Sequence, residues 1–239
     1  MTTIGARLEA VRERIAAACR QHGRDPATVT LLAVSKTFPL EAVCEALRAG
    51  QTAFGENYVQ EGVDKIRTLQ QWRDQPPAEG LAPAVVAQWH CIGPLQSNKT
   101  RPVAEHFDWV HSVDRLKIAQ RLSEQRPPGM APLQVCIQVN VDGGPNKSGV
   151  TPDEAPALAH AVAALPRLQL RGLMCIPEPA ESFEQACEVF GRARRLFDRL
   201  RGEGLDLDTL SMGMSADLEA AIASGSTLVR VGTAIFGAR

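Results

Sequence analysis

The stretch LLAVSKTFPLEAV, residues 31–43, contains one complete step from a strand to a helix. Its apolar run, Leu31 to Val34, predicts a buried strand, and a helical pattern begins after Phe38. Lys36 lies between the two, at the point where the predicted strand ends. A buried strand that leads into a helix is the repeating unit of a parallel sheet, so the stretch indicates an α/β fold.

The same alternation continues along almost the whole chain. Strands are predicted at 31–36, 52–55, 89–93, 108–112, 133–140, 168–175, 208–211 and 227–231. Helices are predicted between them at 39–49, 58–72, 95–105, 114–126, 152–164, 181–202 and 215–223. Eight units in about 210 residues fit a single (β/α)8 TIM barrel. A doubly wound open sheet is the alternative, because periodicity alone does not separate the two folds.

An additional helix is predicted before the first strand, because apolar residues recur there at helical spacing, at Ile4, Leu8, Val11 and Ile15. We expect this amphipathic helix to dock on the domain. No linker interrupts the alternation, so residues 1–239 are predicted to form a single domain. The stretch 75–88, rich in Pro and Ala, is interpreted as a long loop before the third strand.

The composition argues against several classes of protein. A net charge of −1 gives no general attraction to nucleic acid or to an anionic membrane. No segment approaches the roughly 18 apolar residues of a membrane span. The six cysteines lack a CxxC pair and the five histidines lack the spacing of metal ligands, so no disulfide framework and no metal site are predicted. The N-terminus has no apolar secretory segment, which favours a cytoplasmic location.

Polar residues and glycines follow the predicted strands where the strands end. They include Lys36, Asn57, Gly93, Asn140, Ser211 and Gly232. Barrels build their active sites at the carboxyl ends of the strands. We therefore expect these residues to lie on one face of the molecule.

Lys36 is the first candidate for chemistry. Only five of the 26 basic residues are lysines, so a lysine in a special place indicates a use for its amine. An amine at the mouth of a barrel can attack an aldehyde or ketone and form a Schiff base. The residues alone leave open the simpler interpretation, a lysine at a strand end that reaches water.

The segment 209–239 predicts a site for an anion. Ser211 and Ser215 offer hydroxyl groups, and Gly232-Thr233 begins a short helical turn whose N–H groups would face a ligand. Loops after the seventh and eighth strands commonly bind phosphate in this fold. Ser215 fits equally well as a plain helix cap.

Arg230 alternates along the last strand with Val229 and Val231. If those valines meet the helices, Arg230 points into the barrel. A buried arginine needs an acceptor. An acidic residue and an aromatic ring nitrogen are the two candidates.

Several long motifs in their order along the chain resemble the pyridoxal phosphate homeostasis family. They are AVSKT (33–37), FGENYVQE (54–61), WHCIGPLQSNK (89–99), NKSG (146–149), RGLMCIP (171–177), SMGMSADLEAAIASGST (211–227) and VRVGTAIFGAR (229–239). The resemblance extends from about residue 4 to the last residue. Cys91 departs from it, because the family more usually has a bulkier apolar residue there.

The resemblance implies a barrel similar to the N-terminal domain of alanine racemase, the barrel of fold type III pyridoxal phosphate proteins. It implies pyridoxal 5′-phosphate (PLP) bound as a Schiff base on Lys36. Carried over by motif, the phosphate ligands are Ser211, Gly232 and Thr233. Arg230 is expected to face the pyridine nitrogen, and Asn57 to lie beside the cofactor. The pocket is further expected to include His90, Met212 and Met214.

The function that the resemblance implies is PLP homeostasis, in which the protein buffers or delivers the cofactor without a catalytic cycle of its own. An arginine at the ring nitrogen keeps that nitrogen unprotonated, which makes PLP a poor electron sink. Racemases of this fold take a second base from an additional β-domain, and the sequence offers no such segment after the eighth strand. The alternatives are a PLP-dependent racemase or lyase for small amino acids and a Schiff-base aldolase that uses Lys36 without a cofactor.

The expected partners are PLP and PLP-dependent apo-enzymes, with neither nucleic acid nor membrane involved. We expect a monomer or a weak dimer. Lys147 follows the fifth predicted strand, and as a second amine it is a candidate to accept PLP during release. The alternative for Lys147 is a solvated lysine in a turn.

Overall fold

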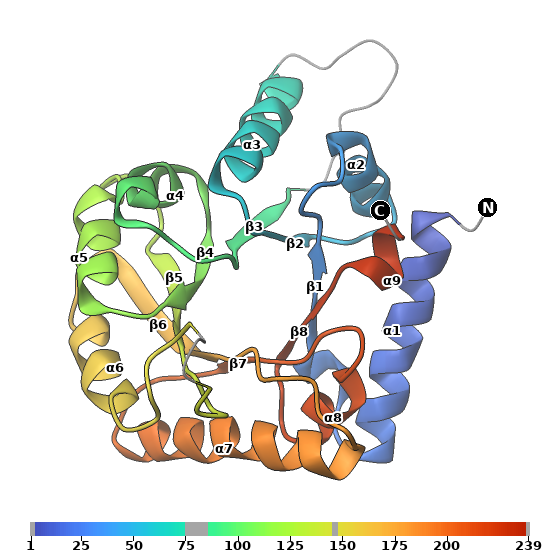
Figure 1. The fold of residues 1–239 in the computed structure, drawn as a ribbon. Helices are drawn as coiled ribbons and strands as arrows, with labels where there is room; N and C mark the ends of the chain where they lie inside the picture. Colours follow the sequence, from blue (N-terminus) through green and yellow to red (C-terminus); the bar gives the residue numbers. More distant parts are fainter. Residues whose placement is uncertain (1–2, 75–85, 145–147, 238–239) are drawn as a thin grey trace.

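Eight parallel strands close into a barrel in the order β1-β2-β3-β4-β5-β6-β7-β8. The structure is a computed structural model that describes residues 3–74, 86–144 and 148–237. Figure 1 looks along the barrel, with the strands around the centre and the helices outside them. The last strand pairs with the first, at Leu32 and Arg230 among other positions. The predicted (β/α)8 barrel is therefore confirmed, and the open sheet is excluded.

The strands are β1 (Thr30–Val34), β2 (Ala53–Glu56), β3 (Gln88–Cys91), β4 (Trp109–Val113), β5 (Leu133–Gln138), β6 (Leu168–Met174), β7 (Thr209–Ser211) and β8 (Leu228–Val231). The α-helices are α1 (Ile4–Gln21), α2 (Leu40–Arg48), α3 (Val59–Asp74), α4 (Thr100–His106), α5 (Leu116–Gln125), α6 (Ala155–Ala163), α7 (Phe183–Gly202), α8 (Leu218–Ala223) and α9 (Thr233–Phe236). Short 3-10 turns are η1 (Pro26–Thr28) and η2 (Ser97–Lys99).

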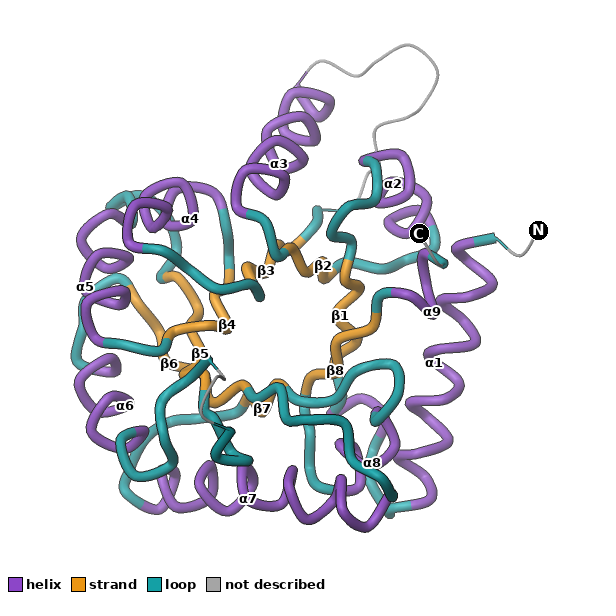
Figure 2. The backbone as a smooth tube through the Cα atoms, in the orientation of Figure 1, coloured by secondary structure: helices purple, strands orange, loops and turns teal. Residues whose placement is uncertain are grey.

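Two element ends differ from the prediction in ways that affect the site. β1 ends at Val34, so Lys36 lies in a turn that the N–H of Phe38 closes on the carbonyl of Ser35 at 3.1 Å. α8 begins three residues later than predicted, because the N–H of Met214 donates to the carboxylate of Asp217 at 2.5 Å and holds the chain in a turn. Both turns extend the loops at the carboxyl ends of the strands (Figure 2).

Side chains alternate between the outside and the inside of the barrel. Val229 and Val231 belong to the large core between strands and helices, whereas Leu32 and Leu228 form a small apolar cluster inside the barrel. Arg230 therefore points inward, as the alternation along the last strand predicts. The interior also holds a second apolar cluster, made of Trp109, Cys136 and Met174, and buried polar residues that are described below.

The predicted N-terminal helix is present as α1, which packs against α2, α8 and α9 (Figure 1). Its Leu8, Val11 and Ile15 are buried in the core, which is the face that the apolar spacing predicts. Arg14 pairs with Glu219 of α8 at 2.8 Å and also donates to the carbonyl of Ser215 at 3.2 Å. The helix thus connects the outside of the barrel with a loop at its carboxyl face.

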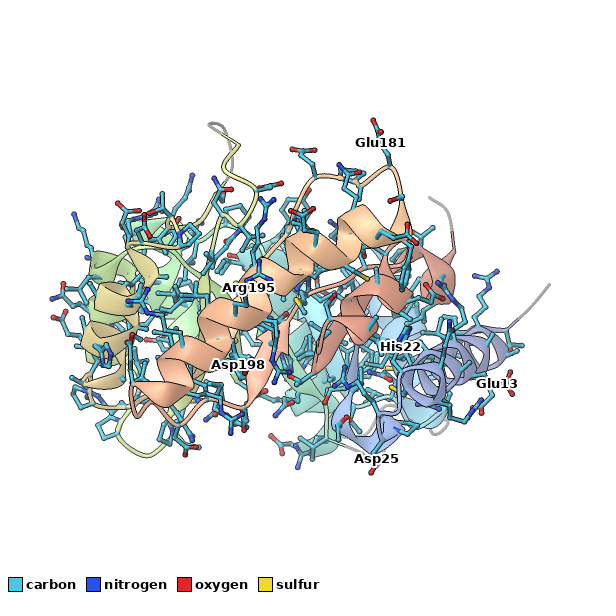
Figure 3. All side chains as sticks on the ribbon, turned by 90° about the horizontal axis from the view of Figure 1, so that it is seen from below. Glu13, His22, Asp25, Glu181, Arg195 and Asp198 are labelled. Atoms are coloured by element: carbon cyan, nitrogen blue, oxygen red, sulfur yellow. The ribbon has the colours of Figure 1, made fainter. Side chains whose placement is uncertain are left out.

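The outer faces of the helices are charged, as α7 illustrates. Arg195 and Asp198 lie on the side of α7 that faces away from the barrel (Figure 3). Arg194 pairs with Asp198 at 2.8 Å, and Arg199 pairs with Glu203 at the same distance. The basic run at 191–204 is therefore the solvated face of a helix.

The cysteines behave as small apolar residues. All six are free, and five of them are buried, the exception being the half-buried Cys187. Burial raises the pKa of the Cys91 thiol to about 12. Among the described residues no helix is both long and apolar enough to cross a membrane.

Candidate functional site

A cavity of about 640 Å³ lies at the carboxyl ends of β1, β2 and β8. Five of the six residues that the sequence predicts for the site line it: Lys36, Asn57, Arg230, Gly232 and Thr233. The loops that carry them are neighbours because β1 lies between β2 and β8 in the barrel (Figure 2). The sixth predicted residue, Ser211, is not on the wall.

The backbone on both sides of Lys36 is held by a cluster of charged residues. Ser35 donates its hydroxyl to Glu56 at 2.6 Å, and the N–H of Thr37 donates to Glu61 at 2.6 Å. Lys65 lies between the two carboxylates, 2.7 Å from each, and also donates to the carbonyl of Ser35 at 2.8 Å. These contacts fix the turn that carries Lys36, so we call Glu56, Glu61 and Lys65 the clamp.

The amine of Lys36 itself has no hydrogen-bond or ion-pair partner within the described parts of the chain, and the residue is half-buried. Thr37 has a φ of 64°, a left-handed conformation that is strained for a β-branched residue. The turn therefore presents an unengaged amine to the cavity on a backbone that is held firmly in place.

Glu56 and Lys65, two members of the clamp, form a buried ion pair. Glu56 is fully buried and Lys65 is 6% exposed. Burial raises the pKa of Glu56, while the neighbouring Lys65 opposes this effect. Sequence reasoning missed the clamp, and the spacing of Glu61 and Lys65 by four residues on a predicted helix was its one local signal.

Asn57 reaches the cavity because Gly93 leaves room for its backbone. A Cβ atom at position 93 would lie 2.8 Å from the Cα of Asn57 and would overlap its carbonyl oxygen. Only glycine permits this approach of the loop after β2 to the end of β3. Gly232 lies close to β1 in a less crowded contact, since a Cβ atom there would lie 3.2 Å from the carbonyl oxygen of Val34.

Arg230 is a buried cation without a carboxylate partner in the described residues. It is 4% exposed, and burial lowers its pKa. Its Nη1 donates to the carbonyl and the hydroxyl of Ser211, at 2.8 and 2.7 Å, and its Nη2 donates to the carbonyl of Cys175 at 2.9 Å. A guanidinium has five N–H donors. Nε–H and one Nη2–H therefore stay unused by the described protein groups beside the cavity.

Ser211 lies behind Arg230 and is fully buried. Its hydroxyl accepts from Arg230 and lies 2.9 Å from a ring nitrogen of His111. Ser215 instead lines the cavity, together with Gly232 and Thr233. Asp217 is the N-cap residue of α8, a position for which the sequence also suggested Ser215. The Ser215 side chain is therefore available to the cavity.

The three further residues expected in the pocket have different positions. Met214 lines the cavity and is 39% exposed. Met212 is wrongly assigned to the pocket, because it faces the helices and is buried in the large core. His90 is also wrongly assigned, because it lies inside the barrel and is absent from the cavity wall. Residues that sequence reasoning did not single out complete the wall, among them Phe38, Ile92, Ile176 and Ala216.

The site combines a lysine after the first strand of the barrel with a buried arginine on its last strand. Comparison with known proteins shows to which family of barrels this chain belongs. The family described as alanine racemase, N-terminal domain, matches residues 6–239. A pyridoxal phosphate homeostasis protein of Pseudomonas aeruginosa is 58% identical over 100% of this chain and 97% of its own length. One from Escherichia coli is 54% identical, with coverage of 100% and 98%. The chain belongs to the pyridoxal phosphate homeostasis protein family.

Solved structures agree with this assignment. PipY of Synechococcus elongatus without PLP is 38% identical, with a TM-score of 0.81 over 98% of this chain and 100% of PipY. The structure of PipY with PLP bound is 36% identical, with a TM-score of 0.80 and the same coverage. Alanine racemase from Corynebacterium glutamicum shares the fold, with a TM-score of 0.63 at 18% identity, and this chain spans 62% of its length.

Proposed function

We propose that this chain binds PLP in the cavity, with Lys36 as its Schiff-base lysine, and that it buffers or delivers the cofactor in PLP homeostasis. The observation that carries the proposal is the pairing of two unengaged groups on one wall. Among the described residues Lys36 offers an amine without a protein partner, and Arg230 offers buried N–H donors without a counter-ion. An aldehyde and an aromatic nitrogen are the groups that these two lack.

The remaining wall suits the rest of the cofactor. Val34 and Ile92 offer apolar surface to a ring, and Asn57 offers an amide beside it. Ser215, Gly232 and Thr233 are the proposed phosphate ligands. Gly232 precedes the first turn of α9, in which the N–H groups of Ile235 and Phe236 donate to the carbonyl of Gly232. The N–H groups of Thr233 and Ala234, at the start of the turn, have no acceptor within the helix. Ser211 was expected on the phosphate, and its place behind Arg230 favours Ser215 in that role.

A role without catalysis follows from the electrostatics of the same wall. PLP supplies an electron sink when its ring nitrogen is protonated, and Arg230 can only donate to that nitrogen, which keeps it unprotonated. Among the described lining residues Lys36 is the single side chain that can act as a base. Racemisation with two bases therefore lacks a partner for Lys36 on this part of the wall. The relatives from Pseudomonas aeruginosa and Escherichia coli are named homeostasis proteins, which supports the same proposal.

The decisive experiment is borohydride reduction of the purified protein with PLP, followed by peptide mapping. We expect a single pyridoxyl group, on Lys36, and none in the Lys36→Ala variant. Lys117→Ala, which changes an exposed lysine of α5, is the matched control and should be labelled like the wild type. Labelling of another lysine in the wild type would refute the assignment.

The racemase or lyase alternative is tested with D- or L-alanine in deuterated water. Exchange of the Cα hydrogen at turnover rates would overturn the non-catalytic proposal. The aldolase alternative requires a colourless protein, so a yellow protein that loses its colour on Lys36→Ala excludes it.

We propose a single domain over residues 1–239, a cytoplasmic location, a monomer or weak dimer, and PLP-dependent apo-enzymes as recipients. Lys147, the candidate for a second amine, lies outside the described residues, as does the part of the predicted loop at 75–85. Normal transfer kinetics in Lys147→Ala would refute a role for that lysine.

A further inference from the structure

A line of four hydrogen bonds runs from the cavity wall through the interior of the barrel. Nη1 of Arg230 lies 2.7 Å from Oγ of Ser211, which lies 2.9 Å from Nδ1 of His111. Nε2 of His111 lies 2.9 Å from Nδ1 of His90, and Nε2 of His90 lies 3.1 Å from Oε1 of Gln88. Gln88 is the exposed first residue of β3. The line therefore crosses from the carboxyl end of the barrel to its amino end.

The middle of the line is shielded from water and tightly packed. Ser211 and His111 are fully buried, and His90 is 1% exposed. The ring of His90 stacks on Trp109 with a centroid distance of 5.1 Å and an angle of 10° between the planes. Burial lowers the pKa of His90 to about 3 and holds that of His111 well below its ordinary value, so both rings are neutral at neutral pH.

The direction of every hydrogen bond follows from the Gln88 end. The amide oxygen of Gln88 only accepts, so Nε2 of the neutral His90 carries the hydrogen and donates to it, and Nδ1 of His90 is an acceptor. The neutral His111 therefore donates from Nε2 to His90 and accepts on Nδ1. Ser211 gives its hydroxyl hydrogen to that nitrogen, while its oxygen accepts from Arg230. Each residue of the line donates a hydrogen bond that the next residue accepts, and every hydrogen bond is donated in the direction away from the cavity.

We infer that Ser211, His111 and His90 are positioning residues that hold the guanidinium of Arg230 against the cofactor cavity and replace a carboxylate as its support. The inference rests on the proposed function, because it assigns to Arg230 the contact with the pyridine nitrogen. It gives Ser211 a role toward the ring of the cofactor instead of its phosphate.

A line of neutral side chains holds Arg230 in place without neutralising its charge, which a carboxylate would do. A carboxylate would take two N–H donors in a forked pair and neutralise the charge of Arg230. The hydroxyl of Ser211 presents only an oxygen lone pair, and that oxygen becomes a better acceptor because its own hydrogen is bound by His111. Arg230 thus keeps its charge, and its orientation is fixed while two of its N–H donors stay unused by the described protein groups.

The tautomers provide a test that needs no cofactor. Nitrogen NMR of the histidine rings at neutral pH should show His90 and His111 as neutral rings with hydrogen on Nε2, before and after PLP is added. A hydrogen on Nδ1 of either ring, or a charged ring, would reverse or break the line and overturn the inference.

The role in binding is tested by comparing PLP with pyridoxal, which has the same ring and aldehyde but no phosphate. Ser211→Ala should raise the Kd of both ligands by the same factor, about tenfold, the order expected for one hydrogen bond to a charged group. It should also shift the visible absorption band of the bound ligand. Ser215→Ala should weaken PLP alone. A loss in Ser211→Ala that is confined to PLP would make Ser211 a phosphate ligand and overturn the inference.

The matched control is Ser226→Ala, because Ser226 is also fully buried and donates its hydroxyl to the carbonyl of Met212 at 2.7 Å, outside the line. It should lower thermal stability and leave both Kd values and the spectrum unchanged. Equal binding in Ser211→Ala and Ser226→Ala would refute the positioning role. If Ser211→Ala does not fold, His90→Gln breaks only the far part of the line and should raise both Kd values equally, by about threefold. If the wild type binds neither ligand, the proposed function fails, while the nitrogen spectra still decide whether the line exists.

Discussion

The amine of Lys65 lies 2.7 Å from a carboxylate oxygen of Glu56, and both side chains are buried in the barrel that carries the candidate Schiff-base lysine. Replacing Lys65 with Met would leave a buried carboxylate without its cation. We expect Lys65→Met to lower the free energy of unfolding by about 3–5 kcal/mol. Urea unfolding with Lys117→Met, a change at an exposed position, as the control measures the difference.

The double variant Lys65→Met with Glu56→Gln identifies the cause of that loss. A neutral amide in place of Glu56 removes the isolated charge, so the double variant should recover part of the stability. If it is no more stable than Lys65→Met, the loss comes from packing and the ionic explanation is wrong.

Gly93 provides a prediction that connects stability with binding. Gly93→Ala places a methyl group against the backbone of Asn57, so the loop after β2 must move. We expect a loss of about 1–3 kcal/mol in the free energy of unfolding and a higher Kd for PLP. Gly129→Ala is the control, because a Cβ atom there meets no atom within 4 Å. Equal Kd values in the two variants would show that Asn57 does not need this position to serve the cavity.

The sequence predicts the fold well because the deciding pattern is local. Each strand and each helix is visible as a short run with its own periodicity, and eight such units leave few alternatives. Closure of the barrel is different, because it depends on the pairing of β1 with β8, strands at opposite ends of the chain. No local pattern reports that pairing.

The residues of the candidate site also fall into two groups, those that local patterns predict and those that depend on contacts between distant parts of the chain. Lys36, Gly232 and the inward direction of Arg230 follow from strand ends and alternation, which are local properties. Ser211 and His111 make a contact across 100 residues of sequence, so the support of Arg230 was invisible before the barrel brought the two strands together. The place of Ser215 on the cavity wall could not be predicted, because a serine before acidic residues also looks like a helix cap. Its position depends on the turn that Asp217 forms.

Thr37 gives a prediction about strain beside Lys36. A β-branched residue in the left-handed region costs about 1–2 kcal/mol, a cost that glycine does not carry. Thr52 is also exposed but has an ordinary backbone conformation. We expect Thr37→Gly to be more stable than Thr52→Gly by about 1–2 kcal/mol. Thermal unfolding of the two variants measures the difference, and equal stability would mean that the turn holds no strain at Thr37.

The two buried histidines predict how stability depends on pH. In the unfolded chain each imidazole binds a proton below about pH 6.5. In the native protein His90 stays neutral down to a pKa of about 3, and the pKa of His111 is also lowered well below its ordinary value. Between these pH values the unfolded state binds more protons than the native state, so the free energy of unfolding falls as the pH falls. His90 contributes a slope of about 1.4 kcal/mol per pH unit in that window, and His111 adds a slope of the same sign below about pH 6.5.

The slope can be assigned to its source by removing one titrating ring. His90→Gln should reduce the slope of unfolding free energy against pH by about one proton between roughly pH 6 and pH 4. Carboxylates such as Glu56 and Asp108, whose pKa values burial raises, titrate in both proteins and cancel in the difference. Urea unfolding at a series of pH values measures both slopes. Identical slopes would mean that His90 takes up its proton in the native barrel, which the neutral line from Arg230 to Gln88 does not allow.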